Sequence, residues 1–192
     1  YLVLANTGAG FSGSDDNFSS FGLEPLVDAG FGKARGVELS IQKKLSDIPY
    51  YGIFSFTYSQ ADYTSLDGIE RPGSYDQNWL LSISGGYKFN EYWEFSSKFR
   101  FASGKPYTPY NSDGTQNVED YNTHRLKSSH SLDVRVDKRW YFAGWTLITY
   151  VDIQNIYNQQ NQSNVRWDPQ TMSVDETSSI GILPSIGISA EF

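Results

Sequence analysis

Several residue types that carry chemistry in other proteins are scarce or missing in this chain of 192 residues. It has no cysteine and only two histidines, which excludes disulfide frameworks, thiol catalysis and thiolate zinc sites. The longest uninterrupted apolar run is five residues, 1–5, so we expect no membrane-spanning helix. With a formal net charge of −7, the chain has no basic excess with which to displace phosphate counterions, and we expect no nucleic-acid partner.

Aromatic residues are abundant, with 14 Tyr, 12 Phe and 5 Trp making up 16% of the chain. Such residues favour β-strands, and we find no apolar pattern at helical spacing. In the stretch 132–140, Leu132, Val134 and Val136 alternate with charged residues at every odd position. Because neighbouring side chains of a strand face opposite sides, this stretch has one apolar and one ionic face. The chain is therefore predicted to be all-β.

The expected strands are joined by links that alternate strictly between long and short. In an antiparallel up-and-down meander every second connection lies at the same end, so the long loops would share one rim. Outer-membrane barrels have this asymmetry, and a soluble meander has no physical reason for it. The long links are 8–28, 64–77, 105–127 and 158–180, and the short ones are 46–49, 90–91 and 141–143. The eight strands are 1–7, 29–45, 50–63, 78–89, 92–104, 128–140, 144–157 and 181–192.

Aromatic residues also occur at the ends of these strands rather than in their middles. Amphipathic rings rest at the headgroup depth of a bilayer, so two aromatic bands around an apolar belt indicate a transmembrane barrel. A soluble sandwich, the less favoured interpretation, would concentrate its aromatic residues in mid-strand. The expected interfacial belt consists of Tyr50, Trp79, Phe89, Trp93, Trp140, Trp145 and Tyr157.

Charged residues divide between the loops and one face of the strands. The long loops hold most of the acidic excess, whereas strand charges such as Glu94, Arg100 and Arg135 fall mostly on the side opposite to the apolar residues. There they would line a water-filled interior and pair across strands. Outer-membrane lipids are then the expected neighbours of the apolar side.

Five stretches of the chain follow one another in an order typical of one protein family. They are Ala34–Leu45, Ser103–Pro109, Asn122–Leu126 followed by Leu132–Trp140, Asp152–Asn158, and Leu183–Phe192. In this order they resemble the carboxy-terminal third of the barrel of TonB-dependent outer-membrane receptors, over about residues 29–192. The resemblance implies that residues 1–192 are the C-terminal segment of a transmembrane barrel of about 22 strands, whose plug domain is absent from this chain.

The resemblance further implies a role in nutrient uptake. A complete receptor of this family would take up a siderophore, vitamin, glycan or peptide with energy that TonB passes to the plug. This segment would supply barrel wall and extracellular loops, without enzymatic activity and without a cofactor. The implied partners are outer-membrane lipids, the other strands and plug of the same receptor, and TonB through the plug; a surface lipoprotein stays open as a further one.

The last strand resembles the signal that the barrel-assembly machinery reads at the end of outer-membrane barrels. Its familiar form is polar–x–Gly–x–x–aromatic–x–aromatic. Ser185, Gly187 and Phe192 match this form, while Ala190 stands at the first aromatic position. The barrel-assembly machinery is therefore another expected partner.

Candidate catalytic and metal-binding groups are few. Asp120, His124 and His130 lie near the top of one expected strand, but no Gly-x-Ser-x-Gly supports a nucleophile, so rim histidines without a catalytic role are expected. Residues 113–120 place oxygen ligands at alternate positions, as a calcium loop would, yet they lack the glycine and final glutamate of the helical calcium loop. We expect a solvated acidic loop and no metal site.

Loop residues give a set of candidate ligand contacts. Aromatic side chains in the long rim loops cannot be explained by burial in lipid, and they could stack on sugars, metal chelates or peptides. Packing of the loops against each other explains them equally well. The candidate residues are Arg71, Tyr107, Tyr110, Tyr121 and Trp167.

Three alternatives stay open at this point. A free-standing eight-stranded outer-membrane barrel could act as an adhesin, anchor or surface-binding protein, since eight strands suffice to close one. An outer-membrane hydrolase could use the rim histidines, and a soluble barrel could bind a ligand. The ordered stretches, and a chain that begins at Tyr1 inside a strand pattern, favour a fragment of a receptor.

Overall fold

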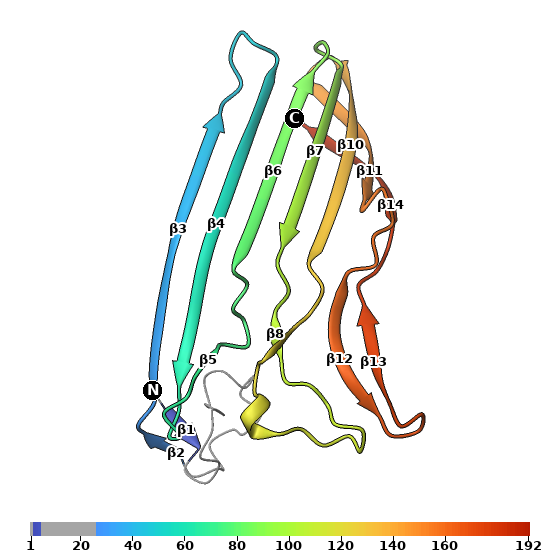
Figure 1. Ribbon diagram of the computed structural model, residues 1–192. Coiled ribbons are helices and arrows are strands. Elements are labelled where there is room, and N and C mark those ends of the chain that lie inside the picture. Colours follow the sequence, from blue (N-terminus) through green and yellow to red (C-terminus); the bar gives the residue numbers. More distant parts are fainter. Residues whose placement is uncertain (1, 5–25) are drawn as a thin grey trace.

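The computed structural model describes residues 2–4 and 26–192, and it consists of antiparallel strands. One large sheet, hereafter the main sheet, runs in the order β14-β11-β10-β7-β6-β4-β3, with the short β5 paired to β4 (Figure 1). The prediction of an all-β, antiparallel meander is confirmed. Its strands are β3 (Phe31–Lys43), β4 (Tyr50–Thr64), β5 (Glu70–Pro72), β6 (Trp79–Lys88), β7 (Trp93–Ala102), β10 (Ser129–Phe142), β11 (Trp145–Gln154) and β14 (Leu183–Glu191).

Smaller elements lie in the connections. Three two-stranded sheets accompany the main sheet, and a single turn of 3₁₀-helix, η1 (Val118–Asp120), lies in one loop. No helix in the described ranges is long and apolar enough to cross a membrane. The pairs are β1 (Leu2–Leu4) with β2 (Leu26–Asp28), β8 (Pro106–Tyr107) with β9 (His124–Arg125), and β12 (Gln162–Asp168) with β13 (Ser173–Ser178).

One predicted strand is assigned wrongly. Residues 1–7 are expected in the wall, but Leu2–Leu4 pairs with Leu26–Asp28 in a separate ribbon. Alternation within a segment predicts an extended strand but not its partner, and here the partner is β2 rather than a strand of the main sheet. The remaining residues of this strand, and most of the predicted loop 8–28, lie outside the described ranges.

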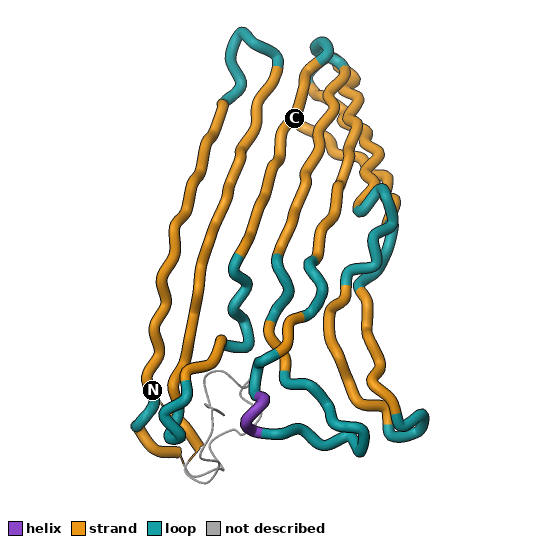
Figure 2. Tube along the Cα trace, viewed as in Figure 1, coloured by secondary structure: helices purple, strands orange, loops and turns teal. Residues whose placement is uncertain are grey.

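The predicted difference between the two ends of the sheet is confirmed. The short turns 44–49, 89–92 and 143–144 gather at one end, and the long links gather at the other, which we call the rim (Figure 2). The rim links are 65–78, 103–128 and 155–182, and they contain the small sheets β8–β9 and β12–β13.

The main sheet has two edges, β3 and β14, and it is not closed. Each of the six steps from β3 to β14 is antiparallel. An even number of reversals leaves β3 and β14 pointing in the same direction. A direct pairing of the two edges would therefore be parallel.

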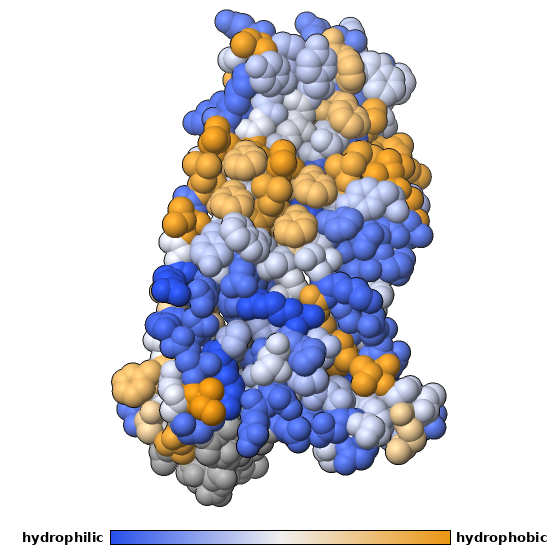
Figure 3. All heavy atoms as spheres, viewed as in Figure 1, coloured by the Kyte–Doolittle hydropathy of each residue, from blue (hydrophilic) through white to orange (hydrophobic). Residues whose placement is uncertain are grey.

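The two faces of the main sheet differ sharply in chemistry. One cross-strand row reads Ile41, Phe54, Ile83, Phe99 and Leu132, and the next row reads Ser40, Ser55, Ser82, Arg100 and Ser131. We call the side of the first row the apolar face and the opposite side the polar face. Apolar side chains form a band across the sheet, with hydrophilic residues between it and the rim (Figure 3).

Nothing in the described part of the chain covers the apolar face. Ile41 is 58% exposed, Ile186 83% and Ile188 77%. The only buried hydrophobic residues of the described ranges are Tyr121 and Val165, and both lie in the rim links. The main sheet is thus one layer without a hydrophobic core of its own.

The register of the last strand gives a direct test of this fold. Thr149 and Ile188 stand opposite each other on β11 and β14, where directly opposed Cβ atoms are about 5 Å apart. Because the chain has no native cysteine, Thr149→Cys combined with Ile188→Cys should form a disulfide rapidly on mild oxidation, as measured by mass after thiol alkylation. The control pair, Thr149→Cys with Ile186→Cys, is one diagonal step away and should react much more slowly. Faster reaction of the diagonal pair would show a register shifted by two residues.

Candidate functional site

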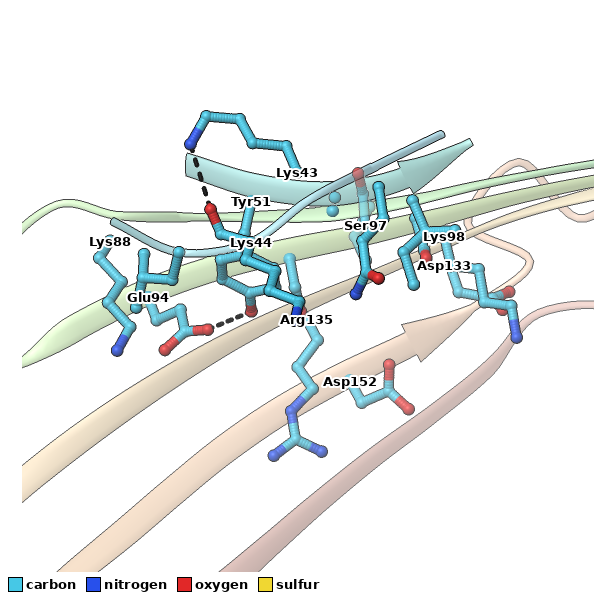
Figure 4. Close-up of a pocket in the computed structure, with 18 of the residues that line it drawn as sticks. Lys43, Lys44, Tyr51, Lys88, Glu94, Ser97, Lys98, Asp133, Arg135 and Asp152 are labelled. Carbon is cyan, nitrogen blue, oxygen red and sulfur yellow. Dashed lines mark hydrogen bonds between the residues drawn. The ribbon is translucent and has the colours of Figure 1, made fainter. Parts of the chain in front are cut away.

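The polar face has a hollow near the short-turn end of the sheet. Its volume is about 690 Å³, and it is lined by side chains from β3, β4, β6, β7, β10 and β11 (Figure 4). Charged residues of both signs face it together with serines, as the alternation of the strands predicts. Its ionisable lining includes Lys44, Tyr51, Glu94, Lys98, Arg135 and Asp152.

Two tyrosines lie over glycines of the neighbouring strand on this face. A Cβ atom at Gly86 would come within 2.5 Å of the Tyr51 ring, and one at Gly187 within 2.3 Å of the Tyr150 ring. Tyr51 is directly opposite Gly86, and Tyr150 is directly opposite Gly187. Only glycine leaves room for these rings, so Gly187 has a packing role beside its match to the assembly signal.

Each tyrosine fixes a charged group. The Tyr51 hydroxyl donates to Oε1 of Glu94, whose Oε2 accepts a hydrogen bond from Arg139 at 2.8 Å. The Arg135 guanidinium lies 3.8 Å from the Tyr150 ring centroid, and its Nε and Nη2 donate three hydrogen bonds to the Asp137 carboxylate. These contacts hold two charge pairs of the polar face in place, Arg135 with Asp137 and Arg139 with Glu94.

A second hollow of about 540 Å³ lies toward the rim. It is lined mainly by hydroxyls, amides and cations, including Arg100, Lys127 and Asn155. Asp133 and Gln154 line both hollows, so the two adjoin. Arg100 binds Asp133 at 2.6 Å at this junction. Together the hollows form a continuous polar surface from the rim links to the polar face.

A buried carboxylate joins two rim links. The Asp76 side chain is 1% exposed and accepts hydrogen bonds from Arg125 Nη2 at 2.5 Å, the Ala61 N–H at 2.8 Å and Asn78 Nδ2 at 3.0 Å. Arg125 also donates to the main-chain carbonyls of Asp76 and Gly104. The pair therefore ties link 65–78 to link 103–128 and to the end of β4.

Asn122 adds a second tie between the same links. It is buried and has a φ of 57°, a left-handed conformation that asparagine tolerates better than most residues. Its amide donates to the carbonyl of Pro72 and the hydroxyl of Ser74. The neighbouring Tyr121 hydroxyl lies 3.3 Å from the same Ser74 hydroxyl.

The five candidate ligand contacts do not converge on one spot in the structure. Tyr110 and Trp167 lie near each other, with ring centroids 6.4 Å apart, and Trp167 packs over Gly114. Tyr107 instead lies beside the ring of His124. Tyr121 and Arg71 are both buried, and Arg71 Nη1 binds Asp67 at 2.7 Å. Every one of these contacts joins parts of the rim links, so loop packing accounts for the positions, while ligand binding stays a prediction.

The rim histidines have partners other than carboxylates. His130 Nδ1 lies 2.8 Å from the Tyr157 hydroxyl, and His124 Nδ1 lies 3.2 Å from the Thr123 hydroxyl. Asp120 accepts a hydrogen bond from Asn117. The three residues considered for a hydrolase thus each have a separate local partner, Asp120 and His124 within link 103–128 and His130 at the start of β10.

The acidic loop at 113–120 binds its own backbone. Asp113 Oδ1 accepts hydrogen bonds from the Thr115 hydroxyl and N–H, and these keep the pKa of the Asp113 carboxyl below its usual value. In the described ranges no group of three or more His, Cys, Asp or Glu side chains is placed to hold a metal ion. Asp113 therefore stabilises a local turn of this loop.

Most of the predicted belt residues are exposed in the structure, and their place at a membrane interface stays a prediction. Tyr50, Trp79, Phe89, Trp93, Trp140 and Tyr157 are exposed, and Trp145 is half-buried. Trp145 stacks between Phe142 and Phe192, the last residue of the predicted assembly signal, with centroids 4.6 and 6.1 Å away. Ser185, the polar residue of that predicted signal, lies opposite Asp152.

Comparisons with protein-family models, with curated proteins and with solved structures found no match to this chain. Its function must therefore be argued from the sheet and its two faces.

The Asp76–Arg125 pair yields a prediction about the rim. Arg125→Met should leave a buried carboxylate without its cation and reduce the local stability of links 65–78 and 103–128 by about 2 kcal/mol. Hydrogen–deuterium exchange of both links should become faster while the amides of β6 and β7 keep their protection. Arg166→Met is the matched control, because Arg166 is largely exposed and its nearest carboxylate oxygen is 3.7 Å away. Equal exchange in the two variants would show that the pair does not hold the links.

Proposed function

We propose that this chain forms part of the wall and the rim loops of a transmembrane β-barrel in an outer membrane, within a TonB-dependent receptor for nutrient uptake. The observation that carries the proposal is the exposed apolar face of a sheet whose opposite face holds ion pairs. In water, this face would leave most of the large apolar side chains of seven strands uncovered. In a bilayer, lipid chains cover it.

The dimensions of the apolar face agree with a bilayer. On β6 the outward residues from Trp79 to Tyr87 span nine positions, and a tilted transmembrane strand needs about 9–11 residues. On β3 and β4, charged and amide side chains begin immediately beyond the belt, where Arg35 binds Gln60. Aromatic rings thus lie between the apolar band and the polar rim, as at a membrane interface.

The direction of the edges supports a larger barrel. Unpaired backbone groups are costly within a bilayer, so a sheet in this environment must close. Because β3 and β14 run in the same direction, closure through antiparallel pairs alone requires an odd number of further strands. We infer that other strands of the same polypeptide supply them, and that the plug would lie against the polar face.

The choice of receptor family rests on the five ordered stretches of the sequence. The adjoining polar hollows support it, because they give a polar ligand a wetted surface from the rim toward the interior. In the receptor, this chain contributes wall, rim and assembly signal, while the plug contributes the gate and the contact with TonB.

The intact polypeptide in native outer membranes tests the receptor proposal. Peptide mapping should identify peptides that precede residue 1, and the intact mass should be several times that of the 21.7 kDa chain. A mature polypeptide of only this length, in a heat-resistant closed form, would contradict the receptor and favour the small eight-stranded barrel.

The lipid-facing assignment has its own test. Ile83 lies in the middle of the apolar row, and Ile83→Lys should destabilise the inserted protein by about 2–4 kcal/mol, the cost of a lysine at the bilayer midplane. Ser55→Lys is the control, because Ser55 lies on the polar face between Ser40 and Ser82. The measurement is the urea dependence of folding into lipid vesicles, followed by the shift in gel mobility of unheated samples. Similar losses for both variants would contradict the assignment of the faces.

A further inference from the structure

A cation interrupts the apolar residues of β10, at a position where the alternation predicts an apolar side chain. Lys138 has the same parity on β10 as Val134, Val136 and Trp140. Its ammonium lies 4.5 Å from the ring centroid of Trp93, 5.0 Å from that of Trp140 and 5.4 Å from that of Tyr92. Three rings therefore surround the charge near the short-turn end of the sheet.

The charge of Lys138 has no counterion within the described part of the chain. None of the ion pairs found there includes it, and its Nζ donates no hydrogen bond to a described residue. Lys43, the corresponding cation of β3, differs in this respect, because its Nζ donates to the carbonyls of Lys44 and Tyr50. Ring faces attract a cation but accept none of its hydrogen bonds fully, so Lys138 keeps donors for an external anion.

A hollow on the apolar face begins at this lysine. Its volume is about 570 Å³, and it extends across β10, β11 and β14, which are neighbours in the sheet (Figure 1). Val136, Val151, Ile186 and Ile188 form its apolar wall, and Gly187 contributes no side chain. The hollow thus has a cation at one end and aliphatic side chains along the rest.

We propose that Lys138 and this hollow form a binding site for one anionic phospholipid of the leaflet at the short-turn side. The phosphate would accept hydrogen bonds from Lys138 Nζ between the Trp93 and Trp140 rings, and an acyl chain would lie over Val136, Val151 and Ile188. The site rests on the proposed function in one respect: the apolar face must lie in a bilayer.

The chemistry of the hollow favours a lipid over other anions. A free phosphate would use the lysine but leave the apolar wall uncovered, and an acidic peptide would place its backbone polar groups against aliphatic side chains without partners. A phospholipid would bind the lysine with its phosphate and cover the apolar wall with an acyl chain. The position of the site along the strands agrees with the depth of lipid headgroups, because the tryptophans that flank the lysine belong to the expected interfacial belt.

The experiment uses the complete polypeptide, reconstituted in nanodiscs of equimolar phosphatidylglycerol and phosphatidylcholine. After extraction into detergent, native mass spectrometry counts the lipids that stay bound. The wild type should retain phosphatidylglycerol over phosphatidylcholine by about five-fold, the effect of one lysine at an anionic surface. Lys138→Gln should abolish the preference and Lys138→Arg should keep it. Lys43→Gln, which removes the same charge at the same end of the sheet, should also keep it.

Three results would overturn the proposal. Equal retention of both lipids by the wild type would exclude a specific site, and equal loss in Lys138→Gln and Lys43→Gln would show only a general effect of positive charge. In both cases, a folded, inserted protein on an unheated gel would leave the barrel intact as a proposal. Failure of the wild type to insert into any bilayer would overturn the barrel together with the lipid site.

Discussion

The structure depends on the apolar face of the main sheet, which no other part of the described chain covers. In a water-soluble protein, the burial of apolar side chains against a second layer supplies most of the favourable free energy of folding. Here the long strands form one layer, and the aliphatic and aromatic side chains of its apolar face point outward. In the barrel proposed above, lipid would be the surrounding medium that makes this arrangement stable. The aromatic rings at the strand ends and the charged residues just beyond them follow from the same condition.

The polar face carries charged side chains instead of apolar ones. Several charges on this side are held in close pairs, and two tyrosines that bind or stack on them lie in the space left by glycines on neighbouring strands. Glu94 and Arg135 illustrate the arrangement, each held by one tyrosine and one oppositely charged residue. Such pairing suits a surface that stays wet but must keep its shape, because each pair holds two side chains in fixed positions. At the rim, the same principle ties separate links together through Asp76 and Arg125.

The sequence predicts the long strands well because each has its own local signal, a period of two between apolar and polar residues. From Leu132 to Trp140 that signal is almost perfect, and the strand is found there. The same signal does not predict which strand a segment pairs with. Leu2–Leu4 reads as a wall strand but pairs elsewhere, and the hairpin β12–β13 has too few apolar residues to show its alternation.

The contacts of the site are harder to predict than the strands. Tyr51 and Gly86, or Asp76 and Arg125, are far apart in the sequence, and only the register of the sheet or the path of a loop brings them together. The interpretation of Tyr121 as a ligand contact illustrates the difficulty, since a loop tyrosine is exposed or buried according to its neighbours. Here it is buried next to Ser74. Once the register is known, a glycine opposite a tyrosine on the polar face of two adjacent strands predicts that the tyrosine ring lies over the glycine.

We propose that one face of the main sheet lies in lipid and the other in water. Nitroxide scanning along β6, one residue at a time from Trp79 to Ser84 in the reconstituted polypeptide, tests this assignment of the two faces. Collision with oxygen should peak at odd positions such as Leu81 and Ile83, and collision with a water-soluble nickel chelate should peak at Ser82 and Ser84. Two opposite oscillations with a period of two are the predicted result. High access to the nickel chelate at every position would show that both faces lie in water and would contradict the account.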